Sequence, residues 1–111
     1  MFSIVFAGLI FTLMILISSK GVDHVFGDSV ISTISVEKFP QAIVFNPANN
    51  NIYVVNVVSN SVSIIDSIYN DISETLNINN APLALTYNPS NNATYVTGTL
   101  TGTEGLVTII H

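Results

Sequence analysis

The chain has 111 residues, two lysines, no arginine and seven acidic residues, and its formal net charge is −5. This length accommodates one small domain. A reader of nucleic acid needs clustered cations to contact phosphates, so the charge balance excludes a nucleic-acid partner. Without cysteine and with two histidines, the chain has no disulfide framework, thiolate nucleophile or zinc ribbon. Only 8% of the residues are charged, and Ile, Val, Asn and Ser dominate, which indicates an all-β protein outside the cell or on its surface.

The first segment is predicted to be a targeting segment. Residues Ile4–Ile17 form a nearly unbroken apolar run. As a helix this run would span about 21 Å, which is shorter than the ~30 Å hydrocarbon core and suits the hydrophobic region of a signal peptide. Residues 1–21 are therefore expected to be either a signal peptide cleaved after Gly21 or an uncleaved N-terminal membrane anchor helix, followed by a linker at 22–29. Both alternatives place the rest of the chain in the extracytoplasmic space, secreted or at the cell surface.

Residues 30–111 contain an internal repeat, in which Pro40 is equivalent to Pro82. Pro40–Pro47 reads PQAIVFNP, and Pro82–Pro89 reads PLALTYNP. Nine of the 29 positions from Asp28 to Asn56 are identical to their equivalents in Asn70–Gly98. Towards the C-terminus the match slips by three residues, so a three-residue insertion is expected between Gly102 and Gly105. A repeat of this length indicates that one supersecondary unit is used more than once.

Each unit is expected to form four short antiparallel strands. In the first unit, apolar or alternating segments predict strands at Ala42–Phe45, Ile52–Asn56, Ser61–Asp66 and Ile72–Ile78. Asn, Asp, Ser and Pro separate them and favour tight turns. Val30–Val36 matches the fourth strand and is expected to be the last strand of a preceding unit, before a unit at 40–81 and a partial unit at 82–111. Four strands in ~40–45 residues are typical of a β-propeller blade, so about two blades of an incomplete ring are predicted.

These motifs resemble the YVTN family of β-propeller repeats. The YVTN signature of this family is similar to two tetrapeptides of the chain, Tyr53-Val54-Val55-Asn56 and Tyr95-Val96-Thr97-Gly98. The segments Pro40–Pro47, Ser59–Asp66 and Ile72–Ile78 are similar to the remaining parts of the blade consensus. The resemblance covers about Val30 to Ile110. One departure is that the glycine usual near the end of the fourth strand is absent from both units.

The resemblance implies binding or scaffolding at the cell surface. Related blades occur in prokaryotic surface-layer proteins and in other extracellular binding proteins. The family has no shared catalytic residues, so neither a catalytic residue nor a metal or cofactor is expected. The expected partners are further blades, in the same longer chain or in other copies, and an unknown surface ligand. Membrane attachment through residues 1–21 is expected if that segment is not cleaved.

Few side chains are candidates for a site. Four polar residues border turns and could suggest a calcium site: Asn60, Asp66, Asn70 and Asp71. Turn capping is the favoured interpretation, because calcium takes six to eight oxygen ligands. The recurrence of Tyr53 and Tyr95 indicates packing between blades more simply than an aromatic ligand site. Asn92-Ala93-Thr94 is a glycosylation sequon, and Asn92 is expected to be exposed in a turn. His24 is interpreted as a solvated tail residue.

An alternative function is the N-terminal piece of a propeller enzyme, such as a quinone-cofactor dehydrogenase or a lactonase-like hydrolase. Such enzymes gather charged or metal-binding side chains at the central channel. The predicted loops offer Asn, Ser and Pro and no cluster of Asp, Glu, Arg or His, so binding is favoured over catalysis. Two arrangements would complete the fold. The chain is either a fragment of a longer propeller or one of several copies that close a ring, with Val30–Val36 completing a neighbour's last blade.

Overall fold

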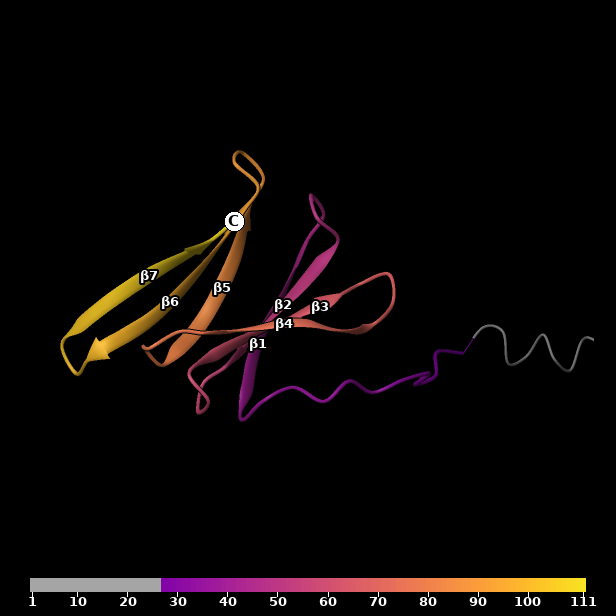
Figure 1. Ribbon diagram of the computed structural model, residues 1–111, viewed down its shortest axis with the longest axis horizontal. Helices are drawn as coiled ribbons and strands as arrows, with labels where there is room; N and C mark the ends of the chain where they lie inside the picture. Colours follow the sequence, from indigo (N-terminus) through magenta and orange to yellow (C-terminus); the bar gives the residue numbers. More distant parts are fainter. Residues whose placement is uncertain (1–26) are drawn as a thin grey trace, which may run out of the picture. The chain divides into compact units, whose positions relative to one another are not determined.

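A computed structural model describes residues 27–111, and each secondary-structure element in this part of the chain is a β-strand. The seven strands are β1 (Pro40–Asn46), β2 (Asn51–Asn56), β3 (Ser61–Asp66), β4 (Asp71–Asn77), β5 (Pro82–Asn88), β6 (Ala93–Thr101) and β7 (Glu104–Ile110). They form two antiparallel sheets, with the orders β1-β2-β3-β4 and β5-β6-β7 (Figure 1). The prediction of an all-β fold with antiparallel sheets is confirmed.

The predicted signal peptide or anchor helix at residues 1–21 lies outside the described residues, and so does His24. Within residues 27–111, no helix is long and apolar enough to cross a membrane. Both sheets belong to the unit Ile34–His111, and their packing is described for that unit alone.

The first hairpins of the two sheets have the same register. Pro40 of β1 faces Asn56 of β2, and the equivalent residue Pro82 of β5 faces Gly98 of β6. The other partner pairs of the two hairpins also consist of equivalent residues, and both ladders shift register just after the proline. The repeat in the sequence is therefore also a repeat of backbone pairing.

The turns β1–β2, β2–β3, β3–β4 and β5–β6 each end with an asparagine in the left-handed region. The φ values are 60° at Asn50, 52° at Asn60, 59° at Asn70 and 60° at Asn92. Asparagine adopts this conformation more readily than other residues with a Cβ atom. In three of these turns a side-chain oxygen accepts a hydrogen bond from the backbone N–H two residues later, at Asn46 (2.9 Å), Asp66 (2.8 Å) and Asn88 (2.9 Å). Turn capping is confirmed for Asp66, and Asn60 and Asn70 lie at the ends of turns.

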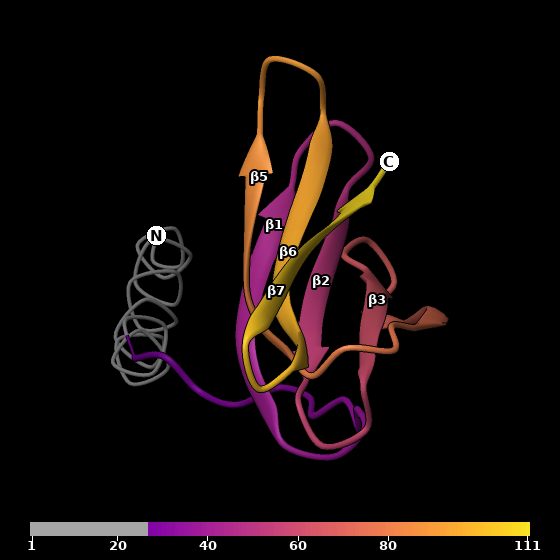
Figure 2. The same cartoon turned by 90° about the vertical axis from the view of Figure 1, so that its left-hand side faces the viewer.

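The core lies between the two sheets, with β5 beside β1 (Figure 2). Its buried members are Tyr53, Val55, Val62, Ile64, Ile78 and Val96. Side chains alternate between the two faces of a strand, so the first sheet contributes the face that bears Tyr53. The second sheet contributes Val96, which lies on the face opposite to Tyr95. Tyr95 is the residue equivalent to Tyr53. The two sheets therefore stack front to back, where the front is the face that bears Tyr53 or Tyr95.

The prediction of a strand at Val30–Val36 is wrong for this chain. No strand is formed between residues 27 and 39. A strand exists only where its backbone groups pair with a neighbouring strand. The match to the fourth strand predicts that Val30–Val36 pairs in a sheet that precedes the first sheet, and residues 27–111 form no such sheet. The segment therefore has no ladder to join.

The predicted turn is present at residues 102–103, and the insertion also lengthens the β6–β7 hairpin. The sequence predicted a turn between Gly102 and Gly105. In the structure Thr101 of β6 pairs with Glu104 of β7, and the register shifts between Thr99 and Thr101. The added residues therefore continue the ladder, and β6 reaches nine residues, which makes it the longest strand.

Gly98 is required for space. A Cβ atom at this position would collide with the backbone oxygen of Asn80 and would lie 3.1 Å from the backbone oxygen of Ala81. Its equivalent in the first sheet, Asn56, carries a complete buried side chain. The two signature tetrapeptides therefore end differently because the connection before the second sheet passes directly over Gly98.

We predict that Asn50→Ala lowers the free energy of unfolding by about 1 kcal/mol, because a Cβ atom without a compensating polar side chain is disfavoured in the left-handed region. The matched variant Asn50→Gly should change this free energy by less than about 0.5 kcal/mol, because glycine adopts positive φ freely. Urea unfolding at equal chain concentration measures both. Equal losses for the two variants would contradict the conformational explanation.

Gly98→Ala is expected to lower the free energy of unfolding by about 1–3 kcal/mol, the range for overpacking a filled site. Gly102→Ala is the control, because no atom lies within 4 Å of a Cβ atom built there. Thermal unfolding of the two variants provides the comparison. The steric explanation fails if both melt at the temperature of the unsubstituted chain.

Candidate functional site

The candidate metal ligands do not gather into one site in the described part of the chain. Within residues 27–111, no group of three His, Cys, Asp or Glu side chains is placed to hold a metal ion. Asp66 and Asp71 are partners at the end of the β3–β4 ladder, where Asp66 caps the turn. His111 Nε2 lies 3.2 Å from the backbone oxygen of Asn91. The remaining candidates are binding surfaces.

The asparagine of the first signature tetrapeptide anchors the segment that leads into β1. Asn56 is fully buried, and its Nδ2 donates to Ser61 Oγ (3.1 Å) and Ser63 Oγ (2.9 Å). The Ser61 hydroxyl donates in turn to Glu37 Oε1 at 3.1 Å. Close by, the backbone N–H of Lys38 donates to Ser59 Oγ at 2.9 Å. These bonds hold the segment before β1 against β2 and β3. Asn56 therefore has a structural role.

The two signature tyrosines make the same hydrogen bond and differ in burial. Asn49 Nδ2 donates to the Tyr53 hydroxyl at 2.9 Å, and Asn91 Nδ2 donates to the Tyr95 hydroxyl at 2.8 Å. Tyr53 is buried between the sheets, whereas Tyr95 is half-buried on the uncovered face of the second sheet. The same side chain therefore occupies a covered site in one sheet and an uncovered site in the other.

The other signature residues lie on both faces of their strands. Val54 and Val55 are buried in β2, Val96 is buried in β6, and Thr97 is exposed. These positions describe how the strands pack and bring no reactive group into a common site.

The sequon asparagine, Asn92, is exposed in the β5–β6 turn, and Thr94 is buried in β6. The Tyr87 hydroxyl donates to Asn92 Oδ1 at 2.7 Å. Asn46 Nδ2 donates to the backbone oxygen of Asn92 at 3.2 Å and so links the turns of the two sheets. The sequon thus lies at a turn that also belongs to the contact between the sheets.

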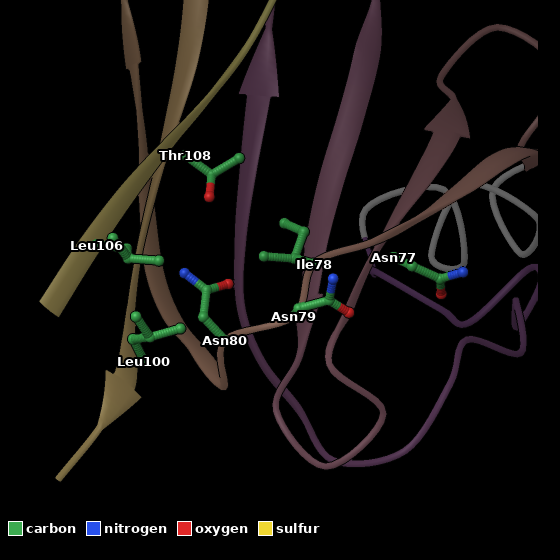
Figure 3. A pocket seen from close by; sticks show the side chains of 7 residues that line it. All are labelled: Asn77, Ile78, Asn79, Asn80, Leu100, Leu106 and Thr108. Atoms are coloured by element: carbon green, nitrogen blue, oxygen red, sulfur yellow. The ribbon is translucent and has the colours of Figure 1, made fainter. Parts of the chain in front are cut away.

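A hollow of about 260 Å³ lies where the β4–β5 connection passes the end of the β6–β7 hairpin (Figure 3). Its lining consists of Asn77, Ile78, Asn79, Asn80, Leu100, Leu106 and Thr108. The Asn80 side chain is buried, and its Oδ1 has no hydrogen-bond partner among the described residues. Sequence reasoning missed this hollow, because it depends on the lengthened hairpin and on the path of the connection. The segment Asn79-Asn80-Ala81, which follows the fourth predicted strand, was the available signal.

Each sheet has exposed apolar side chains on the face that does not contribute to the core. On the first sheet Ile43 is 66% exposed and Phe45 is 47% exposed. On the second sheet Val107 and Ile109 are each 59% exposed. Contiguous exposed apolar side chains mark interaction surfaces in soluble proteins. These exposed side chains are therefore the principal candidate sites for a partner.

No protein-family model matches the chain, and no curated protein matches it either. Its candidate binding surfaces are therefore identified from the residues of this chain alone. The candidates are the exposed apolar side chains of the two sheets and the hollow beside Asn80.

Asn56→Ala should lower the free energy of unfolding by about 1–3 kcal/mol, because the variant leaves buried serine hydroxyls without their partner. The matched control is Asn79→Ala, which removes an exposed amide from the β4–β5 connection. Urea unfolding of both variants checks the prediction. If Asn79→Ala costs as much as Asn56→Ala, the buried hydrogen bonds do not stabilise the entry into β1.

Proposed function

We propose that the chain is a non-catalytic, extracytoplasmic β-propeller repeat protein of the YVTN type, which binds or scaffolds at the cell surface. The observation that carries the proposal is that the β1–β2 and β5–β6 hairpins pair equivalent residues in the same register. The repeated bonds from Asn49 to Tyr53 and from Asn91 to Tyr95 support it further.

The arrangement of the strands supports the blade interpretation. Four consecutive antiparallel strands in sequential order form the first sheet, as in one propeller blade. The second sheet repeats the first three of these strands and stacks on the first sheet. In this proposal residues 40–81 are one blade and residues 82–111 are a partial blade. Further blades, in the same longer chain or in other copies, are its partners.

The apolar run Ile4–Ile17 supports export, by a cleaved signal peptide or with an anchor at residues 1–21. The scarcity of charge and the Asn- and Ser-rich turns are compatible with an extracellular surface. In a host that glycosylates proteins, the exposed turn at Asn92 provides an acceptor site. The exposed apolar side chains, among them Ile43, Val107 and Ile109, support a binding role toward a surface ligand.

The proposal predicts that a C-terminal epitope tag on the full chain stays with washed cells. Protease added to the intact cells should then remove the tag. Mass spectrometry of the N-terminus then separates cleavage before Val22 from an anchor that retains Met1. In the control, Leu13→Lys interrupts the apolar run, and the tag should be protected until the cells are lysed. A protected tag in the unsubstituted chain would refute export, and complete release into the medium would refute scaffolding at the surface.

A further inference from the structure

The third residue of the Asn92 sequon is enclosed by the fold. Thr94 lies in β6, the middle strand of the second sheet, where its ladder partners are Tyr87 of β5 and Ile110 of β7 (Figure 1). The Thr94 side chain is fully buried, and its hydroxyl oxygen has no hydrogen-bond partner among the described residues. Any further chain or partner would add to this cover and could not remove it.

The first two residues of the sequon are held in the β5–β6 turn. The Asn92 N–H donates to the Asn88 carbonyl oxygen at 2.8 Å, and the Asn92 carbonyl oxygen accepts from Asn46 Nδ2 at 3.2 Å. The Ala93 N–H donates to Asn91 Oδ1 at 3.1 Å, and Ala93 is buried. The backbone of the sequon therefore leaves the sheet only if these bonds break.

Glycan transfer requires access to both ends of the sequon. A sequon is defined by its asparagine and by the hydroxyl of its third residue, so the transferring enzyme must reach the Asn92 amide and the Thr94 hydroxyl together. In the folded chain Asn92 is exposed and Thr94 is not. The two groups become accessible together only while β6 is separated from its neighbours.

The Asn92 side chain is compatible with a glycan that is already attached. The Tyr87 hydroxyl donates to Asn92 Oδ1 at 2.7 Å. An N-linked glycan replaces a hydrogen of Nδ2 and leaves Oδ1 as an acceptor, so this hydrogen bond can form after modification. Because Asn92 is exposed, the glycan extends into solvent. A chain that is modified first can therefore still fold.

We propose that Asn92 accepts an N-linked glycan only before the second sheet folds. In the transfer, Asn92 Nδ2 bonds to the anomeric carbon of a lipid-linked sugar, the bond from this carbon to the lipid phosphate breaks, and Nδ2 loses a proton to a base of the enzyme. Folding then buries Thr94 and withdraws the sequon from the enzyme. The inference rests on the proposed extracytoplasmic location, and it adds at which stage Asn92 is modified.

The test compares Asn92 with an exposed sequon in the same chain. Val30→Asn creates this reference sequon at residues 30–32, where each residue is exposed and in no strand. The full chain with this substitution is treated with an oligosaccharyltransferase and a lipid-linked oligosaccharide, and mass spectrometry measures both sites. In the folded chain, whose sheets circular dichroism verifies, Asn92 should be modified at least about tenfold more slowly than the reference sequon, because the enzyme reaches only the transiently unfolded fraction.

A variant that does not fold provides the matched comparison. Val55→Asp and Val62→Asp together place two charges in the core, far from the sequon in the sequence, and should unfold both sheets. In this variant Asn92 and the reference sequon should be modified at similar rates. Thr94→Val should abolish modification of Asn92 in either chain without lowering the urea midpoint of the folded one, because the buried hydroxyl has no partner.

Two results would overturn the inference. One is equal modification of Asn92 and the reference sequon in the folded chain, and the other is modification of the reference sequon alone in the unfolded variant. Neither result depends on where the chain is located in a cell. A chain that passes the protease test on intact cells and gives either result would therefore refute this inference alone.

Discussion

The structure depends on one constraint, which is that a repeated sheet must bury two opposite faces. Side chains alternate along a strand, so each sheet has a front that bears Tyr53 or Tyr95 and a back that bears Val54 or Val96. The core is made from the front of the first sheet and the back of the second. Burial of apolar surface at about 25 cal/mol per Å² stabilises that contact. The front of the second sheet, with Val107 and Ile109, is exposed. On the back of the first sheet Ile43 and Phe45 are exposed, whereas Val54 is buried.

Polar side chains determine where the strands end and how the sheets are connected. Asparagines in the left-handed region close four turns, and Asx side chains cap three of them. Asn56 and Ser61 hold the segment that enters β1. Asn46 links its own turn to that of the second sheet. These contacts position the strands, and the alternating apolar residues then supply the packing.

Much of the fold could be predicted from the sequence, because its signals are local or periodic. The alternation of apolar residues in Ser61–Asp66 and the Asn-rich turns each specify their own structure without distant contacts. The match between Pro40–Pro47 and Pro82–Pro89 predicted the repeat, and the hairpin registers agree with it. The features that were missed depend on distant contacts. Val30–Val36 has the sequence of a strand and no neighbouring strand, and the hollow beside Asn80 requires the lengthened hairpin and the path of the connection.

The central claim is that the face that bears Val107 and Ile109 has no partner within residues 27–111 and is covered by association. Thermal unfolding of the full chain across about a hundredfold range of chain concentration tests it directly, because association that requires the folded state raises the Tm with concentration. The account predicts that the Tm of the unsubstituted chain rises and that Val107→Lys, which places a charge on the uncovered face, removes the rise. A Tm that is independent of concentration, together with a monomer by light scattering, would contradict the account.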